Sequence, residues 1–137
     1  MTSGPMSSRI GVVQEIYAAF GRGDIPAILA HLHPDVQWEY GTPPSEVPWL
    51  RPRQGREEVA GFFESLGNLE FRGFNPKTFL EGPELVAVLL DVNLVVKVTA
   101  KPIVDEEIHL WHFDAAGSVV RFRHVVDTWQ HYTAFRG

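Results

Sequence analysis

The order of the predicted elements constrains the fold most, because helices come first and long strands fill the second half of the chain. Four strand-like runs are separated by turn signals rich in Gly, Pro and Asp. They cover residues 69–80, 84–98, 104–113 and 119–131. Helices followed by a run of long strands predict an α+β fold, in which helices cover one face of an antiparallel sheet.

The first half of the chain contributes two helices before any strand. Residues 8–22 carry apolar side chains at helical spacing, and Ser8 can cap their N-terminus. Asp24 is expected to cap a second, short helix that Pro34 ends.

One strand and one helix follow. Residues 36–40 alternate like a strand, and the four prolines of residues 42–54 predict an irregular loop. A third helix is expected from Gly55, with its apolar face on one side, and Gly67 ends it. The whole order is therefore helix, helix, strand, helix and four strands.

Size and composition limit the classes of protein. The 137 residues suit one domain, which we place at residues 8–137 after a disordered tail at residues 1–7. A net charge of −5 without a cluster of basic residues argues against nucleic-acid binding. Disulfides and thiolate metal sites are excluded, because the chain has no cysteine. No apolar run is long enough to span a membrane and no signal segment is seen, so we expect a cytoplasmic protein.

Several local strings, taken in order, resemble the nuclear transport factor 2-like superfamily, in its SnoaL-like and ketosteroid-isomerase-like branch. They are Val12-Val-Gln-Glu-Ile-Tyr17 with Gly23-Asp24, His33-Pro-Asp-Val36, Pro52-Arg-Gln-Gly55, and the run from His109 to Arg123. The resemblance implies a cone-shaped roll, in which a curved sheet wraps around the N-terminal helices. It also implies a small apolar ligand inside the cone and a homodimer formed through the sheet.

The resemblance does not extend to the residues of the steroid isomerases. Their carboxylate base, their tyrosine and their protonated aspartate correspond to Tyr40, Ile16 and His109 of this chain. Proton transfer between carbons needs a base and a matched oxyanion donor. Steroid isomerase activity is therefore not expected.

The last hairpin is predicted to present two histidines on one face. A four-residue loop at 114–117 would pair His109 with Phe122 and Glu107 with His124. The residues that share this face are then Glu107, His109, Trp111, Phe113, Phe122 and His124. We expect this face to line the pocket, since His109 matches an inward position of the family. His124 falls where the SnoaL-like cyclases carry a catalytic aspartate.

The run at 84–98 can be oriented in two ways. One parity holds Val86, Val88, Leu90, Val92 and Leu94, and the other holds Ala87, Leu89, Asp91 and Asn93. By correspondence with the family we expect the second set, with Asp91, to point into the cone and the first to meet a second copy. The converse, with Asp91 and Asn93 in solvent, stays open.

The candidate catalytic residues are His109 and His124, with Asp91 as a third member. Histidine suits general acid–base chemistry because its pKa lies near neutrality. A dehydratase of this superfamily uses two histidines and an aspartate in this way. Asp127 is a further candidate, although simple alternation places it on the face opposite His124 unless a β-bulge intervenes. The alternative for both histidines is a hydrogen-bonded role in the cavity wall without chemistry.

A set of mostly aromatic residues is expected to contact the ligand, with ordinary core packing as the alternative. The set is Tyr17, Trp38, Tyr40, Trp49, Phe62, Phe63, Glu107, Trp111 and Phe122. Trp49 is the favoured contact because its Pro-rich loop should lie near the mouth of the cone. No metal site and no cofactor are expected, since His112 alternates away from the other two histidines of the hairpin.

Three functions follow from these features. The first is an isomerase, cyclase or dehydratase that uses acid–base catalysis on a small apolar carbonyl-bearing or cyclic molecule. The second is a binding protein that holds such a molecule without turnover. The third is a dimeric interaction domain, and fold alone does not decide among them.

Overall fold

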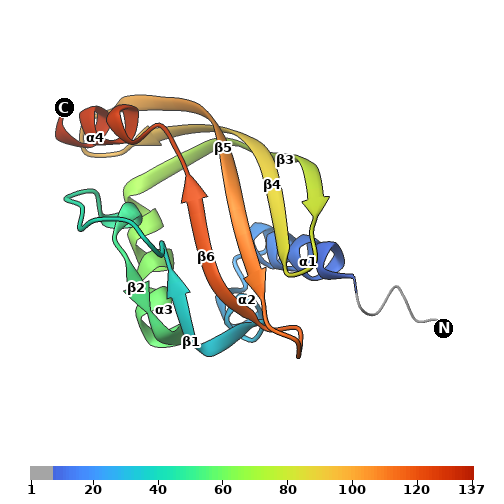
Figure 1. Cartoon of the computed structure of the whole chain (residues 1–137). Coiled ribbons are helices and arrows are strands. Elements are labelled where there is room, and N and C mark those ends of the chain that lie inside the picture. Colours follow the sequence, from blue (N-terminus) through green and yellow to red (C-terminus); the bar gives the residue numbers. More distant parts are fainter. Residues whose placement is uncertain (1–7) are drawn as a thin grey trace.

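The computed structural model describes residues 8–137, so the tail expected at 1–7 lies outside the described residues. Its elements are α1 (Arg9–Gly21), α2 (Ile25–Leu29), β1 (Leu32–Trp38), η2 (Pro48–Leu50), β2 (Arg53–Gln54), α3 (Gly55–Ser65), η3 (Leu66–Asn68), β3 (Leu69–Glu81), β4 (Leu85–Val96), β5 (Lys101–Phe113), β6 (Val119–Val125) and α4 (Thr128–Arg136). One curved sheet carries α1, α2 and α3 on a single face (Figure 1). The predicted α+β cone is therefore confirmed.

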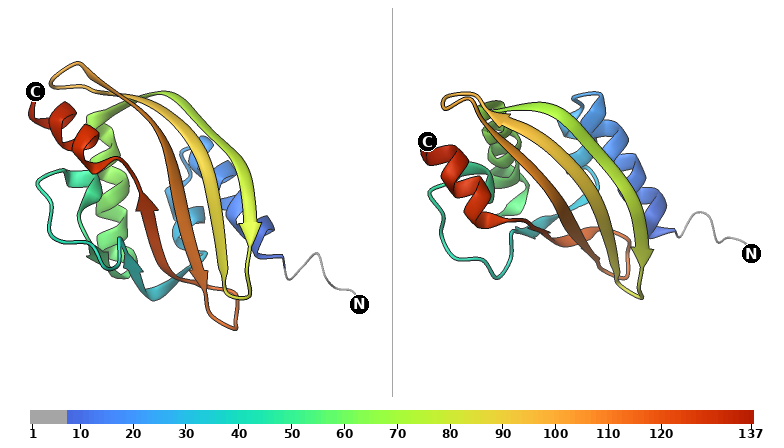
Figure 2. Two further views of the ribbon diagram at one scale, coloured as in Figure 1. Left: turned by 45° about the horizontal axis from the view of Figure 1, so that its top comes forward. Right: turned by 90° about the horizontal axis from the view of Figure 1, so that it is seen from above.

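The six strands follow the order β2-β1-β6-β5-β4-β3. The antiparallel prediction is correct for every pair of neighbours except β1 and β6, which run parallel. This parallel pair is allowed because the chain between them is long and passes through α3 and the whole meander. Seen from above, the sheet forms one curved layer with α1 and α3 on the same side (Figure 2).

The caps of the first two helices are as predicted. Ser8 Oγ accepts a hydrogen bond from the Gly11 N–H at 3.2 Å, and Asp24 Oδ1 accepts one from Ala27 at 3.2 Å. The second helix ends earlier than expected, however, and Pro34 lies within β1. The first strand is accordingly shifted toward the N-terminus and ends at Trp38, before Tyr40.

The orientation expected for β4 is wrong. Val86, Val88, Leu90, Val92, Leu94 and Val96 are the buried set, and they form one wall of the core. Asp91 and Asn93 face solvent on the opposite side, and Lys77 Nζ lies 2.9 Å from Asp91 Oδ1. The physical reason is that this inner face packs against α1, where an unpaired carboxylate would lose its hydration.

The last hairpin keeps the predicted face but not the predicted register. The loop is one residue longer than expected, so Phe113 lies opposite Val119, and an irregularity next to this pair adds one more residue of shift. His109 therefore pairs with His124 instead of Phe122. Because the total shift beyond this irregularity is two residues, the six side chains of the predicted face still share one side of the sheet.

The strand expected to continue to residue 131 ends at Val125, and α4 replaces its last part. Asp127 caps this helix by accepting a hydrogen bond from the Gln130 N–H at 3.1 Å. Figure 1 shows α4 beside the starting end of β5, where it buries His131 and Ala134. None of the helices in residues 8–137 is long and apolar enough to cross a membrane.

A pair of neighbouring substitutions tests the orientation of β4. Val92→Asp should lower the free energy of unfolding by about 3 kcal/mol or more, because it buries a carboxylate without a partner. Asn93→Asp, on the exposed side, should change it by less than about 0.5 kcal/mol. Urea unfolding of both variants measures the difference. Equal effects would contradict this orientation of the strand.

Candidate functional site

An aromatic cavity of about 80 Å³ lies between the inner face of the sheet, α1 and α3. Its wall includes most of the residues predicted to contact a ligand or to carry out chemistry. These are Tyr17, Trp38, Trp49, Phe62, Phe63, His109, Trp111, Phe122 and His124. The remaining wall is largely apolar, with Ile16, Phe20, Ile28, Leu66, Leu69, Phe71, Phe74, Leu94 and His131. A cavity of this size holds a few water molecules or a small organic group.

A buried ion pair lies at the edge of this cavity. The Glu39 carboxylate contacts Nδ1 of His124 through Oε2, and its Oε1 accepts the backbone N–H of His124 at 3.0 Å. Glu39 is only 1 % exposed, so these two donors take the place of water around its carboxylate. The contact through Nδ1 leaves Nε2 of His124 free to give or take a proton, and among residues 8–137 it has no hydrogen-bond partner.

Glu39 reaches the interior because the backbone leaves the strand conformation at this residue. Its φ of 60° lies in the left-handed region, which residues other than Gly rarely adopt. Simple alternation after Trp38 would send Glu39 outward and Tyr40 inward, and the left-handed turn reverses both. The Glu39 N–H is held by the Phe122 carbonyl at 2.7 Å. Strained backbone of this kind persists where the surroundings fix it, and it is frequent at functional sites.

A second chain of hydrogen bonds fixes the tautomer of His109. Trp111 Nε1–H donates to the Tyr17 hydroxyl at 3.1 Å, and His109 Nδ1, 2.7 Å away, is the one acceptor among residues 8–137 for the hydroxyl's own proton, so we assign that proton to this bond. The single N–H proton of the neutral ring then sits on Nε2. That N–H has no hydrogen-bond partner among residues 8–137, and it is available to an acceptor in the cavity.

The two paired histidines differ in pKa because their neighbours differ. Burial, with a smaller repulsion from His124, lowers the pKa of His109 to about 3. Burial alone would also lower the pKa of His124, but the charge and hydrogen bond of Glu39 outweigh it and raise this pKa above its ordinary value. At neutral pH, His109 is therefore neutral, while His124 holds its proton more strongly than a free histidine. The hydroxyl of Tyr17 stays protonated, since burial raises its pKa.

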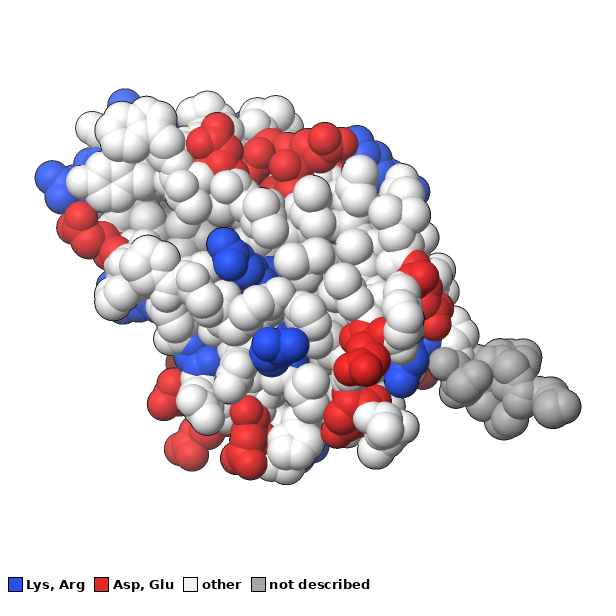
Figure 3. All heavy atoms as spheres, viewed as in Figure 1, with Lys and Arg blue, Asp and Glu red and all other residues white. Residues whose placement is uncertain are grey.

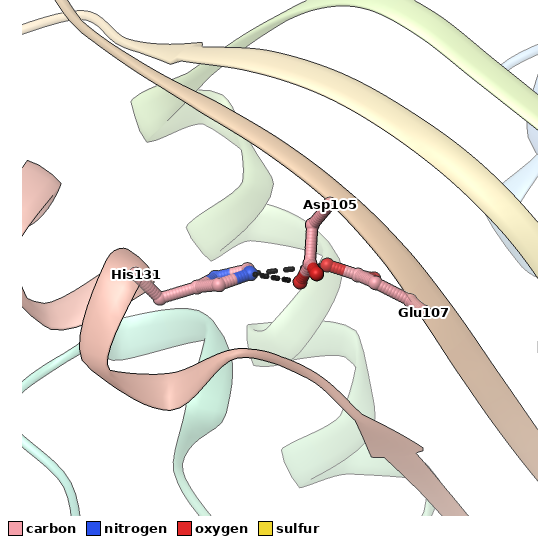
Figure 4. A group of neighbouring side chains, drawn as sticks. All are labelled: Asp105, Glu107 and His131. Carbon is pink, nitrogen blue, oxygen red and sulfur yellow. Dashed lines mark hydrogen bonds and ion pairs between the residues drawn. The ribbon is translucent and has the colours of Figure 1, made fainter.

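A third histidine ties α4 to β5. His131 Nε2 lies 3.0 Å from Glu107 Oε2 and 3.5 Å from Asp105 Oδ2 (Figure 4). Its Nδ1 accepts a hydrogen bond from Trp49 Nε1–H at 3.0 Å. Burial favours a neutral Glu107, but the hydrogen bond with His131 and nearby histidine charges outweigh it and lower its pKa. Burial, together with the charge of Glu107, raises the pKa of Asp105.

The ligand atoms of Asp105, Glu107 and His131 lie close enough together to suggest a metal site. The hydrogen bonds of His131 argue against it. Nδ1 accepts the Trp49 N–H, so the proton of the neutral ring must sit on Nε2, the nitrogen that faces the carboxylates. A protonated nitrogen has no lone pair for a metal ion. The three groups therefore serve to hold α4 in place.

Four of the predicted site residues do not line the cavity. Asp91 is on the outer face with Lys77, and the exposed Asp127 is engaged as the cap of α4. Tyr40 lies outside as well, with its hydroxyl 2.6 Å from His112 Nε2. Glu107 is buried but does not line the cavity, and it acts on the site through His131 and through its charge.

Sequence reasoning missed Glu39 and His131. The only signal for Glu39 was a carboxylate at the end of the first strand, one residue before the position assigned to the base of the isomerases. Likewise, Tyr17 enters the cavity next to Ile16, the position assigned to their tyrosine. His131 carried no signal, because it lay in a segment predicted to be a strand.

The cone and its aromatic cavity define a class of small α+β pocket proteins, and comparison with known proteins places the chain within it. Residues 13–122 match the family model of the SnoaL-like domain. The chain therefore belongs to the SnoaL-like family of the NTF2-like superfamily. No curated protein matches the sequence significantly.

Solved structures agree on the fold. An NTF2-like protein of unknown function from Burkholderia pseudomallei is 28 % identical, with a TM-score of 0.82 over 94 % of this chain and 98 % of that one. An NTF2-like protein from Burkholderia xenovorans is 23 % identical, with a TM-score of 0.78 over 93 % and 95 %. TerC, crystallised with polyporic acid, is 20 % identical, with a TM-score of 0.77 over 94 % and 98 %.

Neutral His109 should make the folded state sensitive to acid. Its folded pKa of about 3 lies below the value of 6.5 for a free histidine, so its contribution to stability is present above pH 6.5 and lost as the pH falls toward 3. His109→Gln keeps an acceptor for Tyr17. It should reduce the slope of the free energy of unfolding against pH by up to about 1.4 kcal/mol per pH unit. Urea unfolding between pH 7 and pH 4 measures it, and identical slopes in the two proteins would contradict the assignment.

Proposed function

We propose that this protein is a cofactor-free enzyme that moves protons on a small, largely apolar carbonyl compound, in a reaction of the isomerase, cyclase or dehydratase type. One observation carries the proposal. Two histidines stand opposite each other on one cavity wall, with ring centroids 5.9 Å apart, and their surroundings push their pKa values in opposite directions. A site can give two residues of one type different roles by shifting their pKa values apart.

His124 is the proton-transfer group in this proposal. Glu39 holds its Nδ1 and stabilises the imidazolium, so the exchange of protons takes place at Nε2. In its neutral form, His124 takes a proton from the carbon beside the carbonyl. In its protonated form, it returns that proton to another carbon or gives it to a leaving hydroxyl. These two steps cover isomerisation and dehydration without any further reagent.

His109 is the partner that stabilises the developing oxyanion. Its Nε2–H is a donor without a net charge, because the hydroxyl of Tyr17 occupies Nδ1. Trp38 adds a second donor, since its buried Nε1–H has no partner among the described residues and its ring lines the cavity. Donors fixed in an apolar, water-poor site stabilise negative charge strongly.

Catalysis of proton transfer can be measured without knowing the natural substrate. Wild-type protein in D₂O should accelerate the exchange of the α-protons of 2-tetralone, followed by NMR. His124→Gln should reduce the accelerated rate by about 10²- to 10⁴-fold, the usual contribution of a general base. The matched control is His112→Gln, on the outer face of the same hairpin, which should keep the wild-type rate.

The pH dependence of this exchange gives a second reading. The rate should rise with pH as His124 loses its proton, with a midpoint above the ordinary histidine value. Glu39→Gln should move that midpoint to lower pH, because it removes the charge that raises this pKa. Binding of 2-tetralone without accelerated exchange would contradict catalysis and favour the binding-protein alternative, which the mostly apolar cavity wall also supports.

We also propose that two copies associate through the outer face of the sheet. Leu89 of β4 pairs with Ile108 of β5, and Ala87 pairs with Leu110, so apolar side chains form a patch turned away from the helices. Figure 3 shows this face with only a few isolated basic groups and with acidic groups toward its margins. Contiguous apolar surface of this kind is typical of association sites.

Ile108→Glu should convert the dimer into a monomer, because it places a charge at the centre of this patch. Analytical ultracentrifugation measures the mass of the wild type and the variant. Lys77 forms ion pairs with Asp91 and Glu106 near the margin of the patch, and the Lys77→Gln variant should stay dimeric. At about 100 μM, a dimer with an interface of ordinary size should be formed. A wild-type protein that is monomeric at this concentration would overturn the proposal.

A further inference from the structure

A groove of about 620 Å³ opens on the other side of His124 from the aromatic cavity. One of its walls is the loop at 42–47, and the other is α4, with the end of β6 between them. His124 lines both spaces, and Glu39 lines the groove. The proton-transfer pair therefore stands at the junction between a small apolar cavity and a larger groove. The groove has the volume of an ordinary small-molecule site.

An unpartnered cation lies in this groove. Among residues 8–137, Arg123 makes no ion pair and no side-chain hydrogen bond, and its Nε is fully buried without a partner. The carboxylate of Glu39, which lines the same groove, is already engaged by His124. A guanidinium with one buried, unpaired nitrogen is unfavourable, and an anionic group of a ligand that binds its accessible end would compensate the charge.

Aromatic surface completes the groove. The rings of Trp129 and Tyr132 stack on each other, with centroids 5.8 Å apart and planes 25° apart. Trp129 is nevertheless 71 % exposed, although it is among the largest apolar side chains of the molecule. An exposed tryptophan in a groove that also holds an arginine is suited to a flat ring carrying a negative charge.

We infer that the groove is the second half of the substrate site and that the substrate is a flat, conjugated or aromatic carboxylate. Its anionic group binds Arg123, its ring lies against Trp129, and its reacting carbon reaches past His124 toward the apolar cavity. That the bound carboxylate is a substrate rests on the proposed function. Its binding to the groove does not depend on catalysis. It also accounts for the small volume of the inner cavity, which then receives only part of the molecule.

A matched pair of probes tests the inference. Wild-type protein should bind 2-naphthoate about tenfold or more tightly than neutral 2-naphthamide, as expected for a charge-assisted hydrogen bond, in calorimetric titrations. Arg123→Gln should abolish this preference and leave the affinity for 2-naphthamide unchanged. Arg123→Lys should keep part of it. Trp129→Ala should weaken the binding of both probes, because it removes the aromatic wall.

The control variant is Arg121→Gln, which removes the same charge two residues away, where the guanidinium lies over the ring of Tyr40 and outside the groove. It should keep the preference. The inference is overturned if wild type shows no preference, if neither probe binds at millimolar concentration, or if Arg121→Gln loses as much as Arg123→Gln. His124→Gln separates the two proposals, since it should stop α-proton exchange and still bind 2-naphthoate in preference to the amide.

Discussion

The contact between Glu39 and His124 is the interaction on which the rest of the site depends. A buried carboxylate is stable only with donors around it, and here both donors come from one residue of β6. The Glu39 N–H in turn donates to the carbonyl of Phe122, so one residue joins the end of β1 to its parallel neighbour. The strained φ of Glu39 is held by these bonds. The same contacts that join β1 to β6 therefore aim the carboxylate at the imidazole.

The opposite pKa shifts of His109 and His124 follow from what each ring can reach. Both are buried, and burial alone would keep both neutral. His124 has a carboxylate on Nδ1, whereas His109 has only the uncharged hydroxyl of Tyr17 there. Burial is the largest cause of the low pKa of His109, and Tyr17 offers its ring no charge that would offset it. Repulsion between the two rings then adds to the separation of their pKa values.

Residues whose position follows from strand alternation were predictable, and those set by a local change of backbone were not. The face shared by His109, Trp111 and His124 was correct even though the register was shifted by two, because parity survives an even shift. Glu39 was missed and Tyr40 was misplaced because a single left-handed residue reverses alternation, and Glu has no special preference for that conformation. The predicted orientation of β4 was wrong for another reason. Correspondence with the family was preferred there to the plain apolar pattern, and burial followed the pattern.

The C-terminal helix shows how the fold separates stability from ligand choice. The match to the family model ends at residue 122, whereas His124, α4 and much of the groove wall come after it. α4 is held by directional bonds from His131 to Trp49 and Glu107, in addition to its apolar contacts. Directional bonds fix the position of a short helix without requiring that its outward side chains be apolar or polar. In the proposed substrate site, Trp129 is therefore free to define what the groove binds, whereas Tyr132 also packs against the core of the cone.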